Sequence, residues 1–254
     1  MGTSSSYKGS SGKIPKAMRE GFEDWVKSQS KGDKTDLPKE VVAQALRIPL
    51  FSRTSTGGGG AGGSSGADEG SSGRQSAPKR SVGSYARTAG RAAELAQAFR
   101  AGDREAIERA GLNFDALAGL PSHAEVVRAI VDVVCSAQTT SDIASEEQRQ
   151  IAGKLVDWML DDALNADLPG AAETAEHAIG LIAAEIFISE AGDTLVGSDD
   201  MPRDELIERI NETSQALASL ANLATSSTDA DSIAKAITRG VRALKKIYAP
   251  VSPA

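Results

Sequence analysis

The sequence predicts an all-α protein: a single globular helical bundle of about six or seven helices, preceded by a flexible N-terminal tail and a Gly/Ser-rich linker. Of its 254 residues, 40% are apolar but only 4% are aromatic, a composition that favours close-packed helices over an aromatic-rich β-sandwich. From residue 82 to residue 249 the apolar residues recur at helical spacing. No convincing two-residue alternation interrupts this pattern, so no strand is predicted.

Capping signals divide this body into helices. Asp103 is placed to cap the second of them. Ser122 and Glu125 have the spacing of a capping box, and Ser145 and Gln148 repeat it ahead of the next apolar run. The predicted helical segments are 82–101, 104–110, a short connector over 112–120, one helix opening at Ser122, one at Ser145, 171–189, one at Pro202, and 233–248.

Composition divides the chain before this body into three pieces. Residues 1–13 are rich in Ser and Gly and are predicted to be a disordered tail. Residues 52–80 are predicted to be a flexible linker, because nine of the 17 residues from 57 to 73 are glycine, which loses the most backbone entropy on ordering. Between them, residues 14–51 form a short helical docking segment, and residues 81–250 form the helical domain.

The docking segment contains one clear amphipathic face. Phe22 and Trp25 lie on it at helical spacing, but the helix is too short to be stable alone in water. The face must therefore pack on something. The sequence leaves open whether it packs on the chain's own helices or on a partner protein, and we name Phe22 and Trp25 as candidate partner-docking residues.

Side chains that could support catalysis are scarce. Cys135 is the only cysteine and lies among apolar residues, as expected of a buried structural thiol. His123 falls at a helix start, and His177 with Glu173 offers only two ligands, too few for a metal site. The glycine-rich stretch is not followed by Gly-Lys-Ser/Thr, so it is not a phosphate-binding loop. We expect a protein that is not an enzyme and has no catalytic residues, metal or cofactor; a nuclease using scattered carboxylates is the least favoured alternative.

Charge is distributed unevenly. Residues 1–100 contain 16 Lys and Arg against 9 Asp and Glu, whereas residues 101–254 contain 12 against 26. Within this acidic part the final helix carries a basic patch: Lys235, Arg239, Arg242 and Lys246. Such a patch is typical of a nucleic-acid surface, but it would equally suit the chain's own acidic helices or an acidic partner. A nucleic-acid-binding adaptor is therefore an alternative function, and not the favoured one.

The leading residues also carry a signal. Methionine is removed before a small residue, so the mature chain is expected to begin at Gly2, followed by Thr3 and Ser4. An unhindered α-amino group titrates near neutral pH and is a competent nucleophile for an activated acyl group. The simpler alternative is an unstructured beginning with no role. No apolar segment follows Met1, and no apolar run approaches the ~20 residues of a membrane span, so a cytoplasmic location without membrane contact is predicted.

Three features together resemble the QatB family, the B component of the four-part Qat anti-phage defence systems of bacteria. They are the start Met1–Ser4, the glycine-rich middle, and the body motifs LNFDALAGLP over 112–121 and IVDVVC over 130–135. The resemblance implies a non-enzymatic component that acts with a QueC-like protein, QatC, with an ATPase and with a TatD-like nuclease. Enzymes of the QueC type activate a deazaguanine carboxylate with ATP and transfer it to ammonia. Our hypothesis is that the Gly2 amine replaces ammonia, so that the tail Gly2, Thr3 and Ser4 is presented to QatC for conjugation.

Overall fold

A computed structural model describes residues 9–33, 35–49, 78–136, 142–161, 163–165, 167–197, 201–225 and 227–249. Within these ranges the protein is all-α, as predicted, with no strand. Its elements are α1 (Lys13–Ser30), α2 (Lys39–Arg47), α3 (Val82–Ala101), α4 (Arg104–Arg109), α5 (Phe114–Ala118), α6 (His123–Val134), α7 (Ile143–Leu160), α8 (Ala171–Glu190), α9 (Gly192–Gly197), α10 (Arg203–Ala218), a 3-10 turn (Ser219–Ala221) and α11 (Ala230–Ile247).

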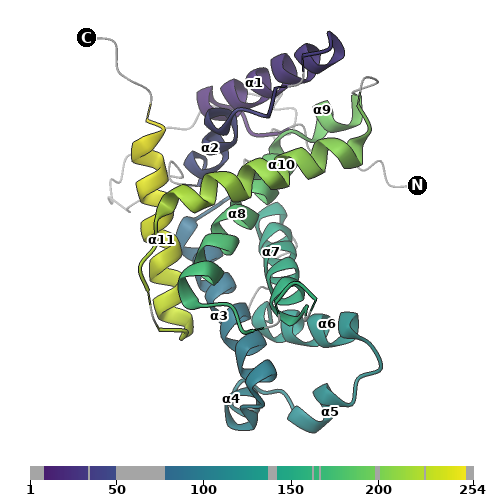
Figure 1. Cartoon of the computed structure of the whole chain (residues 1–254), viewed down its shortest axis with the longest axis vertical. Coiled ribbons are helices and arrows are strands. Elements are labelled where there is room, and N and C mark those ends of the chain that lie inside the picture. Colours follow the sequence, from purple (N-terminus) through teal and green to yellow (C-terminus); the bar gives the residue numbers. More distant parts are fainter. Residues whose placement is uncertain are drawn as a thin grey trace, which may run out of the picture.

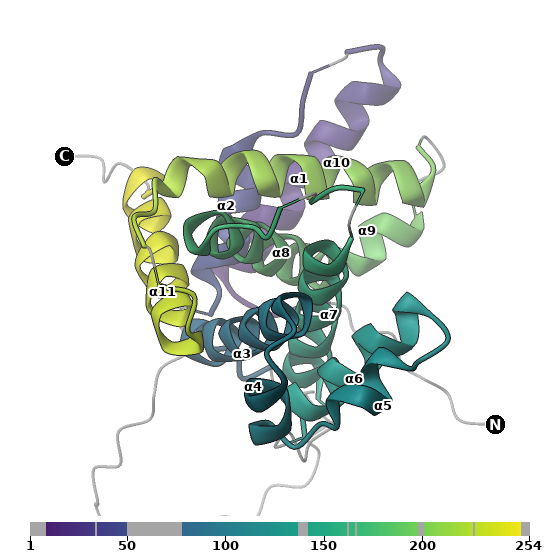
Figure 2. The same ribbon diagram turned by 60° about the horizontal axis from the view of Figure 1, so that its bottom comes forward.

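Helix α8 is the centre of the core. It is apolar around most of its circumference, which is typical of a helix enclosed by others. It packs against α2, α7, α10 and α11, which surround it in Figure 2. Helix α3 lies beside this group and packs on α7 and α11, while α4 and α5 lie at the opposite end of the molecule from α1 (Figure 1). One hydrophobic cluster runs through all of these layers.

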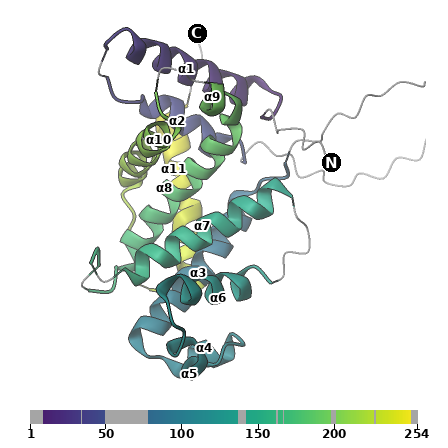
Figure 3. The ribbon, with the colours of Figure 1, turned by 90° about the vertical axis from the view of Figure 1, so that its right-hand side faces the viewer.

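Helices α1 and α2 are part of this core. Phe22 is fully buried and meets Phe187 of α8 edge to face, with ring centroids 5.1 Å apart. Trp25 is 5% exposed, and its indole N–H donates to the Thr35 carbonyl at 3.0 Å. The prediction that Phe22 and Trp25 face a partner protein is therefore wrong for this structure, because both side chains are buried in the chain's own hydrophobic core. Helices α1 and α2 and the body share one core, with α1 covering one end of it (Figure 3).

Two predicted boundaries also need correction. Residues 9–12 are described and α1 begins at Lys13, so the predicted disordered tail over 1–13 is too long; residues 1–8 lie outside the described ranges. Arg80 was assigned to the linker over 52–80, yet it is only 1% exposed. The physical reason is the same at both boundaries: Ser10 and Arg80 both donate hydrogen bonds to the buried carboxylate of Glu190. Residues 52–77 lie outside the described ranges.

The helix starts mostly follow the capping signals. The side chains of Asp103 and Ser122 each accept the backbone N–H three residues later, as predicted. The cap of α7 is Asp142, so the prediction that Ser145 opens this helix is wrong; Ser145 instead donates its N–H to Asp142. None of the described helices combines the length and the apolar character needed to cross a bilayer.

Candidate functional site

The most polar part of the core surrounds Arg80, which lies two residues before the start of α3. The guanidinium donates twice to Glu147 of α7, from Nε to Oε2 at 2.9 Å and from Nη2 to Oε1 at 2.6 Å. It also pairs through Nη1 with Glu190 at the end of α8 and through Nη2 with Ser189 at 3.1 Å. The Tyr85 hydroxyl donates to Oε2 of Glu147. We call Arg80, Glu147 and Glu190 the buried ion cluster; it ties together α3, α7 and α8.

We call residues 2–12, which precede α1, the leading segment. The buried ion cluster binds this segment at Ser10. Ser10 donates its backbone N–H to Glu190 Oε2 at 2.6 Å and its hydroxyl to Oε1 at 2.7 Å. Arg19 of α1 donates to Glu190 at 3.3 Å and to the Ser10 carbonyl at 3.1 Å. Gly9 has a φ of 84°, and a Cβ there would lie 2.8 Å from the Glu190 carbonyl oxygen. Glycine is therefore required by both the backbone conformation and the space.

The electrostatics of the cluster explain why it stays charged. Burial alone would raise the pKa of Glu190, but the Arg80 guanidinium and the hydrogen bonds from Ser10 outweigh it, and the net pKa is lowered. Burial, together with the neighbouring Glu147, raises the pKa of Tyr85, so this phenol remains a hydrogen-bond donor. The arrangement is suited to holding α3, α7, α8 and Ser10 together.

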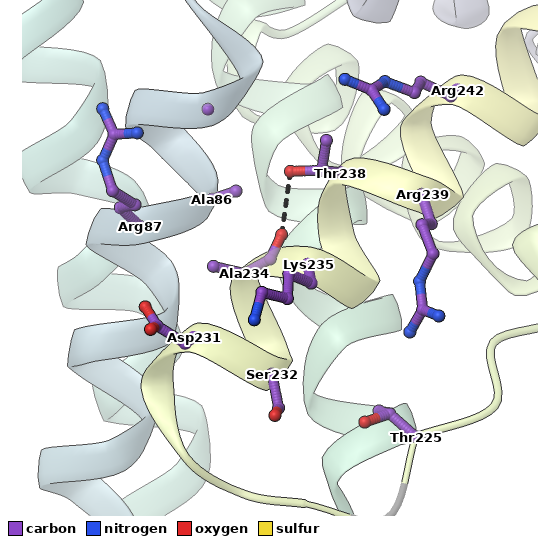
Figure 4. Close-up of a pocket in the computed structure, with 11 residues that line it drawn as sticks. Ala86, Arg87, Thr225, Asp231, Ser232, Ala234, Lys235, Thr238, Arg239 and Arg242 are labelled. Atoms are coloured by element: carbon purple, nitrogen blue, oxygen red, sulfur yellow. Dashed lines mark hydrogen bonds between the residues drawn. The ribbon is translucent and has the colours of Figure 1, made fainter.

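A second polar feature is a groove between α3 and α11, of about 490 Å³. Its cations are Arg87 from α3 and Lys235, Arg239 and Arg242 from α11, and we call it the basic groove. Figure 4 shows Arg87 on one side of the hollow and Arg239 and Arg242 on the other. The structure therefore places three of the four predicted basic residues in one groove; Lys246 is exposed on α11 but does not line it.

Comparisons of the chain with family models, with curated proteins and with solved structures each gave no match. The function must therefore be argued from the residues themselves.

The remaining candidate residues lie in structural positions. Cys135 is 1% exposed, and burial raises its pKa, which disfavours the reactive thiolate. His123 Nε2 lies 2.9 Å from Asp157 at the surface. No group of three His, Cys, Asp or Glu side chains within the described ranges could hold a metal ion. Gly2, Thr3 and Ser4 lie outside the described residues.

His177 stacks on Trp158, with ring centroids 4.0 Å apart and planes inclined by 12°. Burial lowers the pKa of His177 from the ordinary 6.5 to about 4. Between these values the unfolded chain binds a proton that the folded chain refuses, so stability falls as the pH falls through this window. We expect the wild type to lose about 2–3 kcal/mol more stability between pH 7 and pH 4 than His177→Phe, which keeps an aromatic stack but cannot be protonated. Urea unfolding at each pH measures this, and parallel pH profiles would contradict it.

Sequence reasoning missed the members of the buried ion cluster and Arg87. A weak signal existed for Glu147, which falls four residues before the buried Ile151 on the apolar side of its helix. No comparable signal marks Arg80, because its partners lie 67 and 110 residues away along the chain.

Proposed function

We propose that this chain is a non-enzymatic, QatB-like component of an anti-phage defence system, and that its leading residues Gly2, Thr3 and Ser4 are presented to a QueC-like partner enzyme, QatC. The observation that supports this is the anchor of Gly9 and Ser10 on Glu190. Through this anchor, one end of the leading segment is attached to the end of α8, and this attachment point is the origin of the segment. Ser10 follows Gly2 by eight positions in the chain, so the Gly2 amine can reach no farther than ~28 Å from that origin.

In this proposal the Gly2 amine is the acceptor of the deazaguanine acyl group. Its nitrogen lone pair attacks the carbonyl carbon of the ATP-activated carboxylate, the activating group leaves, and the nitrogen loses a proton as the amide forms. The partner enzyme supplies ATP-dependent activation, and this chain supplies only the nucleophile and its positioning. An ATPase and a TatD-like nuclease would act with the conjugate.

Intact-mass analysis of the N-terminal peptide tests the proposal. Co-expression with QatC should add the mass of the deazaguanine carboxylic acid minus water, on a chain that has lost Met1. Because the amine of Gly2 is the acceptor, blocking it by acetylation should abolish the gain. An unmodified Gly2 in the complete four-component system would refute conjugation.

The anchor can be tested separately. Gly9→Ala places a Cβ against the Glu190 carbonyl and strains a left-handed backbone, so it should detach the leading segment and reduce conjugation by about 10-fold while leaving the amine intact. The matched control is Ser11→Ala. Ser11 lies two residues after Gly9 and its side chain is exposed, so this variant should be modified like the wild type. Equal modification of both variants would show that the anchor does not position the segment.

A further inference from the structure

The cations of the basic groove form no ion pair with any acidic side chain that the structure describes. Arg87, Lys235, Arg239 and Arg242 are all exposed, and no ion pair joins any of them to a carboxylate elsewhere in the described ranges. Among the described residues that line the groove, Asp231 is the only acid. The sequence left open whether this basic helix pairs with the chain's own acidic helices; α11 packs on α8 and α10, but among the described residues none of the four groove cations forms an ion pair with them. Four like charges with one counter-charge make a local positive field on a chain whose net charge is −7.

The cations are arranged along a line. Helix α11 rises 1.5 Å per residue, so Lys235 and Arg242 lie ~10 Å apart along its axis. Arg87 lies across from them on α3 (Figure 4). One strand of a nucleic-acid duplex rises ~3.4 Å per nucleotide along the duplex axis, so this length covers about three such steps, which join four successive phosphates. An extended anion with repeated charge fits this spacing better than a single small ion.

The other lining residues distinguish between classes of polyanion. They are small or carry hydroxyl groups: Gly83, Ala86, Thr225, Ser232, Ala234 and Thr238. An acidic protein partner would need large apolar or aromatic anchors to contribute binding energy, and a single strand would need aromatic rings on which bases stack. The groove has neither. Arginine, lysine and hydroxyl side chains are the usual partners of backbone phosphates.

We propose that the basic groove between α3 and α11 binds the phosphate backbone of a nucleic-acid duplex, without reading its sequence. This goes beyond the presentation of Gly2 and does not depend on it. Such binding is electrostatic, and its strength falls with salt in proportion to the number of phosphates contacted.

Fluorescence anisotropy with a short labelled DNA duplex tests the proposal on the full-length protein. Four phosphate contacts predict a slope of about −3.6 for log affinity against log salt concentration. In Arg239→Gln/Arg242→Gln the slope should fall to about −1.8, and affinity at ~50 mM salt should fall at least ~10-fold. Both side chains are exposed, so the variant should keep the wild-type circular dichroism spectrum.

The matched control is Arg203→Gln/Arg209→Gln, which removes two exposed cations from α10 and changes the net charge equally. It should bind the duplex like the wild type. Loss of binding in both variants would show that only net charge matters, and no duplex binding by the wild type at ~50 mM salt would overturn the proposal. Tighter binding of a poly-glutamate peptide or of a single strand would also overturn it, since the groove would then serve a different polyanion.

Discussion

Arg80→Ala is expected to lower the free energy of unfolding by about 3–5 kcal/mol at neutral pH. Arg80 is 1% exposed and is the shared cation of Glu147 and Glu190, which are 4% and 1% exposed. Without it, the buried Glu147 loses its cation and, among the described residues, Glu190 keeps only Arg19, at 3.3 Å, as a counter-charge. The volume of the side chain is also left as a cavity. Equilibrium unfolding in urea, followed by circular dichroism, measures the loss.

Arg91→Ala is the matched control, because Arg91 lies on the same helix but is exposed and makes no ion pair within the described ranges. Its effect should stay within about 0.5 kcal/mol. A loss below about 1 kcal/mol for Arg80→Ala would mean that water or protons reach the carboxylates, and that the buried ion cluster does not hold α3, α7 and α8 together.

Helix ends and amphipathic faces could be predicted from the sequence, whereas the surfaces on which those faces pack could not. The 82–101 segment was predicted with both ends correct, because its apolar periodicity and the following Gly102 are local signals. The burial of Phe22 was implied by its amphipathic face, but not the identity of the surface that covers it. Phe187, its aromatic partner, lies 165 residues later, and local periodicity contains no information about that distance.

The charged residues were the hardest to place. Lys, Arg and Glu are almost never fully buried unless paired, so the sequence alone assigns them to the surface. That assumption is correct for Arg239 and Arg242, which the basic stripe of the last helix identified in advance. It is wrong for Arg80, since pairing depends on tertiary contacts. For the same reason, only one side of the basic groove could be predicted from the sequence. The basic stripe on α11 is a local pattern, whereas Arg87 comes from a helix nearly 150 residues earlier.

Gly90→Ala is expected to lower the free energy of unfolding by about 2 kcal/mol. A Cβ at Gly90 of α3 would lie 2.3 Å from the carbonyl oxygen of Ala230, the first residue of α11. The obstacle is backbone and cannot rotate away, so the two helices must move apart along the contact that also forms the basic groove. This cost exceeds the ~1 kcal/mol that alanine gains over glycine in a helix interior.

Gly153→Ala separates the two effects, because Gly153 lies within α7 and its Cβ would meet only Val131 Cγ2, at 4.0 Å. With space available, helix propensity alone applies, and the variant should be about 0.5–1 kcal/mol more stable than the wild type. Opposite signs for these two substitutions, measured by urea unfolding, would establish that close approach of α3 and α11 sets the requirement for glycine. If Gly90→Ala were as stabilising as Gly153→Ala, the helices would not be in backbone contact, and the width of the basic groove would have to be reconsidered.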